Sequence, residues 1–318
     1  MTHHKPNPYA DCRLSRRQLL TLSAGIALTS LCRPLLGEPL PESLVFRAIP
    51  SSGERIPVIG LGTARTFNVS PDNATAMAAR RKVLDQFYQG GGRLVDSSPM
   101  YGTAETVVGE LAAELGIADE LFMATKIWTQ GREDGIAQMT RSQRRMGGGP
   151  LDLVQVHNLV DTDTHLDTLK AWRKEGRIRY IGVTHYQTGA FDRLATLCER
   201  EPLDFVQFNY NILEREAEKR LLPVARDNGV ATLINEPFEK GTLFGRVRGK
   251  DLPAWAADLD ITSWAQFFLK FIASHPAVTC AIPATSDPGH ARDNIQAAHG
   301  AMPDTQQRER MAALVRQL

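Results

Sequence analysis

The strongest constraint on the fold is a regular alternation of short apolar runs with longer segments of helical periodicity. The segments between the runs, such as residues 190–198 and 263–272, repeat apolar residues at i, i+3 and i+4, the spacing of an amphipathic helix. Near-continuous apolar strands that alternate with helices are typical of a parallel sheet covered by helices. Eight such repeats favour a closed barrel over an open sheet, because they fill the roughly 250 residues that such a barrel needs. The predicted strands are 58–61, 93–96, 121–126, 153–157, 178–182, 205–208, 231–234 and 279–282.

The sequence therefore predicts an α/β protein built as a single (β/α)8 TIM barrel with a short N-terminal β-hairpin. Residues 45–57, with a Ser-Ser-Gly turn, are expected to form that hairpin. The longest connection, residues 238–260, follows the seventh strand. Loops after the strands lie on the functional face of such a barrel, so this loop could cover a ligand.

The start of the chain has a different composition from the rest. Residues 15–20, Ser-Arg-Arg-Gln-Leu-Leu, form a twin-arginine pattern, and the apolar stretch that follows has about 13 residues where a bilayer span needs about 20. A basic lead before a short apolar segment is typical of a secretory signal. We expect export by the twin-arginine machinery to the periplasm or otherwise outside the cytoplasm, without stable membrane insertion after processing; a short anchor or a chance arginine pair is the alternative. The expected parts are a twin-arginine signal peptide and spacer (1–37), the barrel (45–300) and a C-terminal helix or tail (301–318).

Charge and cysteine content give no indication of a nucleic-acid partner or a metal centre. The chain has 37 basic and 36 acidic side chains, a formal net charge of +1, so no strong field favours nucleic acid or an acidic membrane. Two of the four cysteines lie in the predicted signal, and no pair has metal-ligand spacing. Cys198 and Cys280 fall in a predicted helix and a predicted strand and are expected to be buried thiols.

Ionisable side chains stand at the ends of three consecutive predicted strands. Asp96 ends the second strand, with Tyr101 in the loop behind it; Lys126 ends the third strand and His157 the fourth. The carboxyl ends of all barrel strands meet on one face, where active sites form. We therefore expect these four side chains to converge.

The convergence suits carbonyl reduction, which needs a hydride on one side of the carbonyl and a proton from an acid on the other. A free tyrosine has a pKa of about 10, too high for an efficient acid near neutrality. A lysine ammonium about 4 Å away would favour the phenolate by roughly 4 kcal/mol, about 3 pKa units, and Asp96 would keep Lys126 charged while opposing part of that effect. His157 could either donate a hydrogen bond to the carbonyl oxygen or relay the proton.

Several ordered motifs carry a family resemblance. Residues 96–102, Asp-Ser-Ser-Pro-Met-Tyr-Gly, with Glu105 after them, resemble the signature of the aldo/keto reductases, as do residues 124–126, 156–157 and 176–183. The similarity extends over residues 45–300. It implies a TIM-barrel oxidoreductase that reduces an aldehyde or ketone to an alcohol, or the reverse, with NADPH or NADH and no separate dinucleotide-binding domain. It also implies a small carbonyl or alcohol substrate, a monomer, and Asp96, Tyr101, Lys126 and His157 as the catalytic residues.

The resemblance also implies cofactor contacts. Gln207 matches a residue that binds the nicotinamide carboxamide, and residues 283–288 match the segment that cradles the adenosine end. Locally, Asp287 is a favourable N-cap and Pro288 a favourable first helical residue, so a helix N-terminus is expected to face a phosphate. The full set of implied cofactor residues is Gly62, Thr63, Thr184, His185, Gln207, Asn235, Pro283, Thr285, Ser286, His290 and Asn294.

Three departures from the family pattern concern the cofactor. Asn235, followed by Glu236, stands where the family commonly has an aromatic residue that stacks on the nicotinamide. Ala284 and His290 stand where NADPH-specific members carry lysine and arginine, so the choice between NADPH and NADH stays open, with Arg246, Arg248, Lys250 and Arg292 as compensating charges. Thr184-His185 replaces the usual Ser-Asn pair.

Two other functions are compatible with a barrel of this kind. The first is a barrel that binds a nucleotide or other ligand without turnover, as a sensor or accessory subunit. The second, a hydrolase or isomerase, fits poorly, because such sites pair carboxylates or bind metal and this one has a single carboxylate beside a lysine. The substrate is not indicated; Trp128, Leu159, Tyr186 and the loop 238–260 are the candidate walls of its pocket.

Overall fold

The computed structural model describes residues 44–318. Predictions for residues 1–43, including the twin-arginine signal and its two cysteines, lie outside the described residues.

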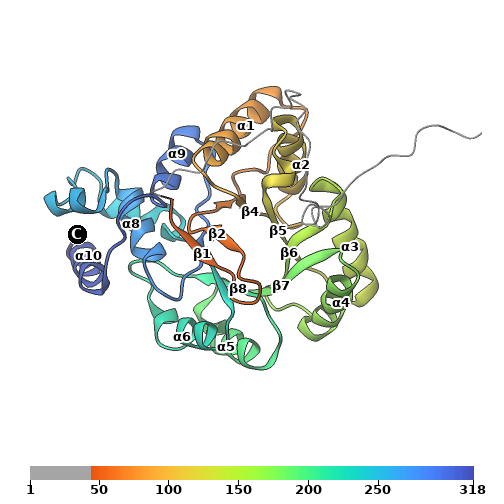
Figure 1. Ribbon diagram of the computed structural model, residues 1–318. Coiled ribbons are helices and arrows are strands. Elements are labelled where there is room, and N and C mark those ends of the chain that lie inside the picture. The colour runs from red at the N-terminus through yellow and green to blue at the C-terminus, as the bar shows by residue number, and fades with distance from the viewer. Residues whose placement is uncertain (1–43) are drawn as a thin grey trace, which may run out of the picture. The chain divides into compact units, whose positions relative to one another are not determined.

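Eight parallel strands form a sheet in which each strand pairs with its neighbours in chain order. The sheet closes on itself through parallel bridges Ile59–Ala281 and Gly62–Ala284, and the Gly60 amide donates to the Ala281 carbonyl at 2.8 Å. Figure 1 looks down the barrel, with the helices around the strands. The predicted (β/α)8 barrel is confirmed. Its strands are β3 (Leu61–Gly62), β4 (Leu94–Asp96), β5 (Phe122–Ile127), β6 (Leu151–His157), β7 (Ile178–Thr184), β8 (Phe205–Asn209), β9 (Ala231–Asn235) and β10 (Cys280–Ala281).

The helices begin and end where local chemistry favours it. Asn73 and Ser263 accept hydrogen bonds from the amides of Ala76 and Gln266 and so cap the first turns of α1 and α8. Helix α2 stops at Gly116, which adopts φ of 71°, a left-handed conformation that glycine tolerates. The helices are α1 (Ala74–Gln89), α2 (Ala104–Leu115), α3 (Arg132–Arg145), α4 (Thr162–Lys174), α5 (Phe191–Arg200), α6 (Leu221–Asp227), α7 (Thr242–Arg246), α8 (Trp264–Ala273), α9 (Pro288–Gln296) and α10 (Thr305–Gln317).

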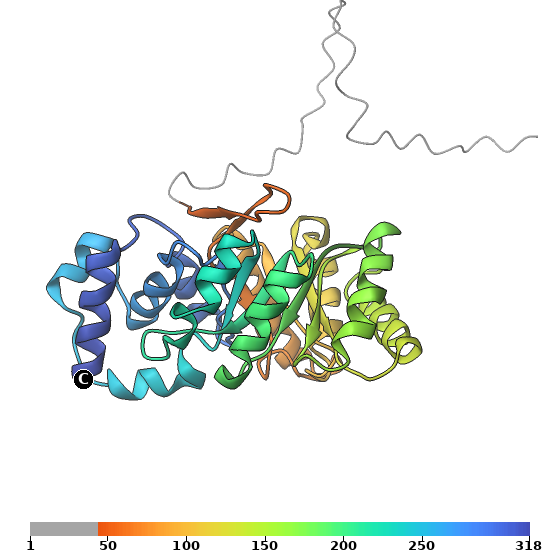
Figure 2. The same ribbon diagram turned by 90° about the horizontal axis from the view of Figure 1, so that it is seen from below.

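The predicted hairpin is present and closes one end of the barrel. Strands β1 (Phe46–Ala48) and β2 (Arg55–Pro57) pair antiparallel. Buried Ile49 and Ile56 pack in one apolar cluster with Phe122 and Phe205, which begin β5 and β8. Figure 2 shows the hairpin lying across this end. The amino-terminal mouth of the barrel is therefore plugged, and the open mouth is the one at the carboxyl ends of the strands.

The segment 238–260 is more ordered than the loop expected from the sequence. It contains α7 and two 3₁₀ turns, Glu239–Gly241 and Ala254–Leu259. Leu243 and Leu259 are buried, and the ring of Phe244 lies 4.9 Å from that of Phe238. Phe244 also packs against Phe268 of α8, with ring centroids 5.9 Å apart, so the segment folds onto that helix. The five residues of α7 are too few for the sequence pattern to indicate a helix.

The last helix is held to the barrel by a buried arginine. Arg308 on α10, 5% exposed, donates to the Tyr210 hydroxyl at 2.7 Å and to Glu218 at 3.3 Å, and also to the Phe271 carbonyl. Arg308 thereby connects α10 to the segment after β8 and to α8.

Two further sequence expectations can be compared with the described residues. Cys198 and Cys280 are both free and buried, as predicted. Within residues 44–318, no helix combines the length and apolar character that crossing a bilayer requires.

Candidate active site

A buried ion pair lies at the open mouth of the barrel. The Lys126 ammonium donates to the Asp96 carboxylate at 2.6 Å and to the Ser97 carbonyl at 2.8 Å. The side chains are 1% and 4% exposed. Burial by itself lowers the pKa of Lys126, but Asp96 and Tyr101 outweigh it and the net pKa is raised. Lys126 is therefore held as a cation, because a buried charge requires such partners.

Tyr101 lies against this cation. The Lys126 nitrogen is 5.3 Å from the centre of the Tyr101 ring. Burial raises the pKa of Tyr101, and Asp96 and Glu236 add to the increase, while Lys126 lowers it. Lys126 thus lowers the pKa and Asp96 opposes it, as the sequence predicted, but the net pKa of Tyr101 is raised. The physical reason is desolvation: the phenol loses more by leaving water than the lysine returns, so Tyr101 stays protonated at neutral pH.

His157 reaches the same place from the end of β6. Its ring meets the Tyr101 ring edge-on, with centroids 6.0 Å apart. Its Nδ1 lies 3.0 Å from the Ser98 hydroxyl oxygen. Burial, and then the charge of Lys126, lowers the pKa of His157 to about 3, so the imidazole is neutral. The four predicted side chains are thus brought together in the fold.

Polar atoms without partners line the interior beside these groups. Gln155 donates to Asp96 at 3.3 Å and to Gln207 at 3.5 Å. Among the described residues, Gln207 Nε2, Asn209 Oδ1 and Asn235 Oδ1 are buried and have no hydrogen-bond partner. Because unpaired buried polar groups are costly, such a row points to a polar ligand that supplies the missing bonds.

The ladder places several implied cofactor residues side by side. His157 pairs with Thr184, which pairs with Gln207, across β6, β7 and β8. His185 is partly buried, and its ring stacks on that of Tyr186 with centroids 5.6 Å apart. On the other side of the barrel, Gly62 pairs with Asp96.

Thr63 has a structural role in the fold as it stands. Its amide and its hydroxyl both donate to the Asp96 carbonyl, at 3.1 and 2.9 Å. Its carbonyl accepts from the amides of Thr66 and Phe67, and the residue is 0% exposed, so Thr63 fixes the loop after β3.

The segment before α9 borders a cavity of about 360 Å³. Its lining combines aromatic residues from 238–264 with Ala284, Thr285, His290 and Asn294. Pro283 is buried behind them, while Ser286 is exposed. The cavity therefore has an apolar wall and a polar wall, as a site for a flat polar ligand would.

The amino terminus of α9 has the predicted cap, with Asp287 as the N-cap and Pro288 as the first helical residue. Asp287 accepts from the amides of Gly289 at 2.7 Å and His290 at 3.1 Å. These are two of the donors that a phosphate would use, and the carboxylate adds a negative charge at the same point. The predicted phosphate site at the helix terminus is therefore already capped by Asp287.

Aromatic side chains rim the mouth. Trp128 is 43% exposed and Tyr186 is 42% exposed, so neither is core packing. Leu159, the third predicted wall residue, is 5% exposed and belongs to the core. Glu236, in a left-handed conformation with φ of 51°, forms an ion pair with Lys240 at 3.3 Å.

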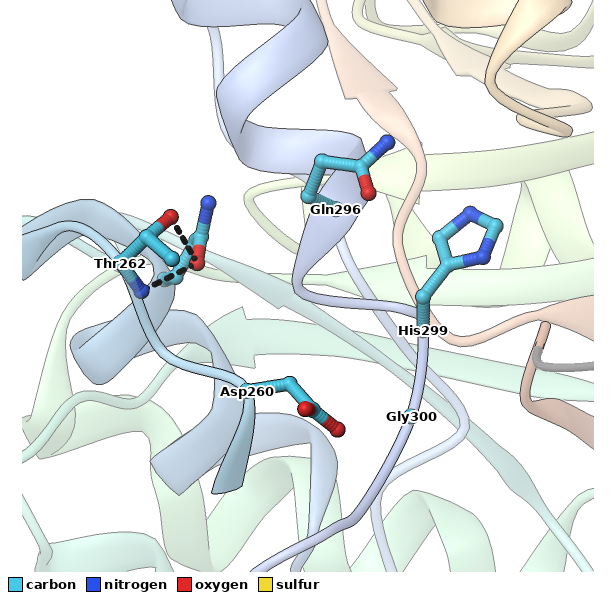
Figure 3. Close-up of a pocket in the computed structure, with 6 residues that line it drawn as sticks. Asp260, Thr262, Gln296, His299 and Gly300 are labelled. Atoms are coloured by element: carbon cyan, nitrogen blue, oxygen red, sulfur yellow. Dashed lines mark hydrogen bonds between the residues drawn. The ribbon is translucent and has the colours of Figure 1, made fainter. Parts of the chain in front are cut away.

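A second cavity, of about 340 Å³, contains none of the predicted catalytic or cofactor-binding residues (Figure 3). It is lined by Asp260, Thr262, Gln266, Gln296, His299 and Gly300. The Thr262 hydroxyl already bonds to Gln266 at 3.1 Å, and a Cβ on Gly300 would lie 2.3 Å from the Asp260 carboxylate. These contacts fit a packed helix junction.

Comparison with known proteins identifies the family. The model of the "Aldo/keto reductase family" matches residues 58–315. The chain belongs to the aldo/keto reductase family. The aldo-keto reductase YhdN of Bacillus subtilis is 30% identical over 220 residues, which is 64% of each chain. The glyoxal reductase of the same organism is 28% identical over 247 residues, 76% of this chain and 83% of the relative.

Solved structures agree on the fold. The aldo/keto reductase of Klebsiella pneumoniae, solved in complex with NADP and acetate, superposes with a TM-score of 0.71 at 22% identity. The match covers 83% of this chain and 93% of that one. At this identity the likeness supports the shared barrel fold alone. The sequence match to YhdN spans 64% of that relative's length, just under two thirds.

Two side chains of this aldo/keto reductase site were not singled out from the sequence. Gln155 bonds to Asp96, and Ser98 bonds to His157. Gln155 carried a signal, because a polar residue two positions before His157 in an apolar strand points to the same side of the sheet. Ser98 lay inside the quoted motif with nothing to set it apart.

Proposed function

We propose that this protein is a nicotinamide-dependent carbonyl reductase, reducing a small aldehyde or ketone to an alcohol or catalysing the reverse. The observation that carries the proposal is the buried Lys126–Asp96 pair against Tyr101, with His157 beside it at the open mouth of the barrel. Membership of the aldo/keto reductase family supports the same chemistry. The relative named glyoxal reductase supports a small carbonyl compound as substrate.

The residues present fit a nicotinamide nucleotide. The unpartnered Nε2 of Gln207 and Oδ1 of Asn235 offer a donor and an acceptor that suit a carboxamide. The cavity beside Thr285, His290 and Asn294 has an aromatic wall that suits an adenine ring. When bound, NADPH or NADH supplies the hydride.

The remaining implied contacts would come from residues around these two anchors. Thr184 and His185 would border the carboxamide, and Gly62, Thr63, Pro283 and Ser286 would contact the nucleotide mainly through backbone or surface. The cap on α9 and the absence of a basic side chain at position 284 leave NADPH and NADH as equal candidates.

The proton comes from Tyr101. Burial raises the pKa of Tyr101, so the phenol holds its proton at neutral pH, and the Lys126 cation opposes this increase and favours transfer of the proton to the oxygen of a bound carbonyl. Lys126 stabilises the phenolate as it forms, and Asp96 keeps Lys126 in place. Trp128 and Tyr186 would pack against the substrate at the mouth.

The twin-arginine pattern at residues 15–20 supports export to the periplasm, and membership of the aldo/keto reductase family supports a monomer. Fusion of residues 1–44 to a reporter tests this: export that is lost when Arg16 and Arg17 become lysine supports the proposal. Retention of the reporter in the cytoplasm would refute it.

The test of function begins with fluorescence titration of signal-free protein with NADPH and with NADH, followed by turnover of small aldehydes and ketones. Tyr101→Phe should bind the nucleotide as the wild type does and lose about 10²- to 10⁴-fold in turnover, the usual contribution of a positioned acid. Tyr88→Phe, on α1 and away from the site, is the matched control. A non-catalytic ligand-binding barrel predicts binding without turnover in the wild type, and that result would replace the reductase assignment.

A further inference from the structure

The contact between Ser98 and His157 concerns the state of the imidazole. The Ser98 hydroxyl oxygen lies 3.0 Å from His157 Nδ1, and the residues are 0% and 7% exposed. They come from the loop after β4 and the end of β6, 59 positions apart in the sequence. Because the pair is buried, water does not compete for this hydrogen bond.

The other bonds of Ser98 decide which partner donates. The Met100 amide donates to the Ser98 hydroxyl oxygen at 3.3 Å. Within the described part of the chain, His157 Nδ1 is the remaining partner of that oxygen. A serine hydroxyl has one proton and two lone pairs. If Nδ1 donated to Ser98, the serine would accept twice and its own proton would have no acceptor in a fully buried position, which proteins avoid. If Ser98 donates to Nδ1 instead, the hydroxyl proton has an acceptor and Nδ1 has a donor.

The imidazole has one proton left to place. Burial and the neighbouring Lys126 lower the pKa of His157 to about 3, so at neutral pH the ring carries a single N–H. With Nδ1 acting as acceptor, that proton is on Nε2. The hydrogen bond at one ring nitrogen commonly determines the tautomer at the other.

We propose that Ser98 is a positioning residue that holds His157 in the Nε2-protonated tautomer, so that His157 donates a hydrogen bond to the substrate oxygen. This assignment rests on the proposed reductase function and decides between the two roles that the sequence left open. A ring whose Nδ1 is occupied by Ser98 and whose Nε2 already bears a proton is a donor; it has no free site to accept and pass on the proton of Tyr101. His157 therefore keeps its proton throughout, and Tyr101 delivers the one that reaches the oxygen.

The tautomer can be measured without any turnover. In ¹⁵N-labelled signal-free protein at pH 7, long-range ¹H–¹⁵N correlations separate protonated from unprotonated ring nitrogens, and loss of signals in His157→Gln assigns them. The wild type should show Nε2 protonated. Ser98→Ala should shift His157 to a mixture or to the Nδ1-protonated form, and Ser98→Thr, which keeps the hydroxyl, should restore the wild-type pattern.

A matched control is available in α3. Ser142 is 0% exposed and its hydroxyl has no partner within the described residues, so Ser142→Ala makes the same chemical change at a comparable burial. Its His157 signals and its turnover should both equal those of the wild type.

Kinetics then test the consequence. Ser98→Ala should reduce kcat about 10-fold, less than the roughly 10²- to 10³-fold loss when an oxyanion donor is removed outright, because part of the population keeps the productive tautomer. The KM for the nucleotide should not change.

Three outcomes would overturn the inference: Nδ1 protonated in the wild type, an unchanged tautomer in Ser98→Ala, or a changed tautomer with unchanged kcat. Absence of turnover in the wild type would instead count against the proposed function, and the ¹⁵N pattern would still decide the state of His157.

Discussion

The polar networks at the two mouths of the barrel differ in exposure and in how many of their atoms have hydrogen-bond partners. At the hairpin end, Arg179 bonds to Glu54 at 2.7 Å and to Asp152 at 2.6 Å, and Tyr180 donates to Glu54 at 2.6 Å. The Arg179 side chain is 44% exposed, so this network is wet as well as complete.

At the carboxyl end of the strands, the polar groups are drier and less satisfied. The Lys126–Asp96 pair is almost fully buried, and the side chains of Gln207, Asn209 and Asn235 each leave an atom unpaired. The Arg179 network is complete without a ligand and contributes to stability, whereas the unpaired atoms of Gln207, Asn209 and Asn235 offer hydrogen bonds that a ligand can complete. Substitutions at the two ends should therefore have different consequences.

The largest effect is expected from Lys126→Met. It removes the cation beside Tyr101 and leaves the Asp96 carboxylate buried without its charge partner. Turnover should fall by about 10²- to 10⁴-fold, and the free energy of unfolding by about 3–5 kcal/mol. Chemical denaturation and steady-state kinetics measure both.

The double variant Asp96→Asn with Lys126→Met sharpens this test. It removes both charges, so much of the stability should return while turnover does not. If the single variant were as stable as the wild type, the picture of a tightly coupled buried pair would be wrong.

A smaller effect is expected from Gln207→Met. Its Nε2 has no partner in the folded protein, so the free energy of unfolding should change little. Nucleotide affinity should fall roughly fivefold, the equivalent of about 1 kcal/mol for one hydrogen bond. Fluorescence titration gives the affinity, with Gln143→Met on α3 as the control. A large loss of stability with unchanged affinity would show that the unpaired atom is not reserved for the ligand.

The smallest effect is expected from Arg179→Met at the hairpin end. The network is half-exposed, so its loss should cost about 1 kcal/mol of stability and leave kcat and nucleotide affinity unchanged. Burial raises the pKa of Glu54, but hydrogen bonds from Arg179 and Tyr180 and the charge of Arg179 outweigh it and hold that pKa below its ordinary value of 4.5. A carboxyl group whose pKa is lower in the folded state than in the unfolded state stabilises the fold at any pH above the unfolded-state pKa. That stabilisation is lost as the pH falls through the folded-state pKa. The difference between variant and wild type should therefore shrink below about pH 4.5 in thermal unfolding; a constant difference would contradict the ion pair.

The fold was predictable because each strand is a nearly pure apolar run. Once eight strands are placed in order in a parallel barrel, residues at their carboxyl ends must meet, so Asp96, Lys126 and His157 could be found without coordinates. The protonation behaviour of these residues could not be predicted. The pKa of Tyr101 depends on how far the effect of burial exceeds the opposing effect of the Lys126 charge. The sequence does not report desolvation.

Side-chain hydrogen bonds could be predicted within a segment but not between distant segments. The Asp287 cap on α9 was predictable, because an N-cap side chain bonds to amides two and three residues later in the same segment. Ser98 finds His157 across 59 positions, and no spacing rule connects them. The buried Leu159 and the short helices within 238–260 were missed for a similar reason, since apolar contacts from distant elements fix them.

The anchoring of α10 bears on how the chain is made. The contacts that Arg308 makes with Tyr210, Glu218 and Phe271 join the final helix to parts of the barrel synthesised about 40 to 100 residues earlier. On a ribosome, chains grow at about 5–20 residues per second. The Tyr210 hydroxyl and the Phe271 carbonyl therefore emerge before Arg308, which donates to both in the folded protein. A chain truncated before α10 lacks these bonds and should therefore be a ready substrate for proteolysis.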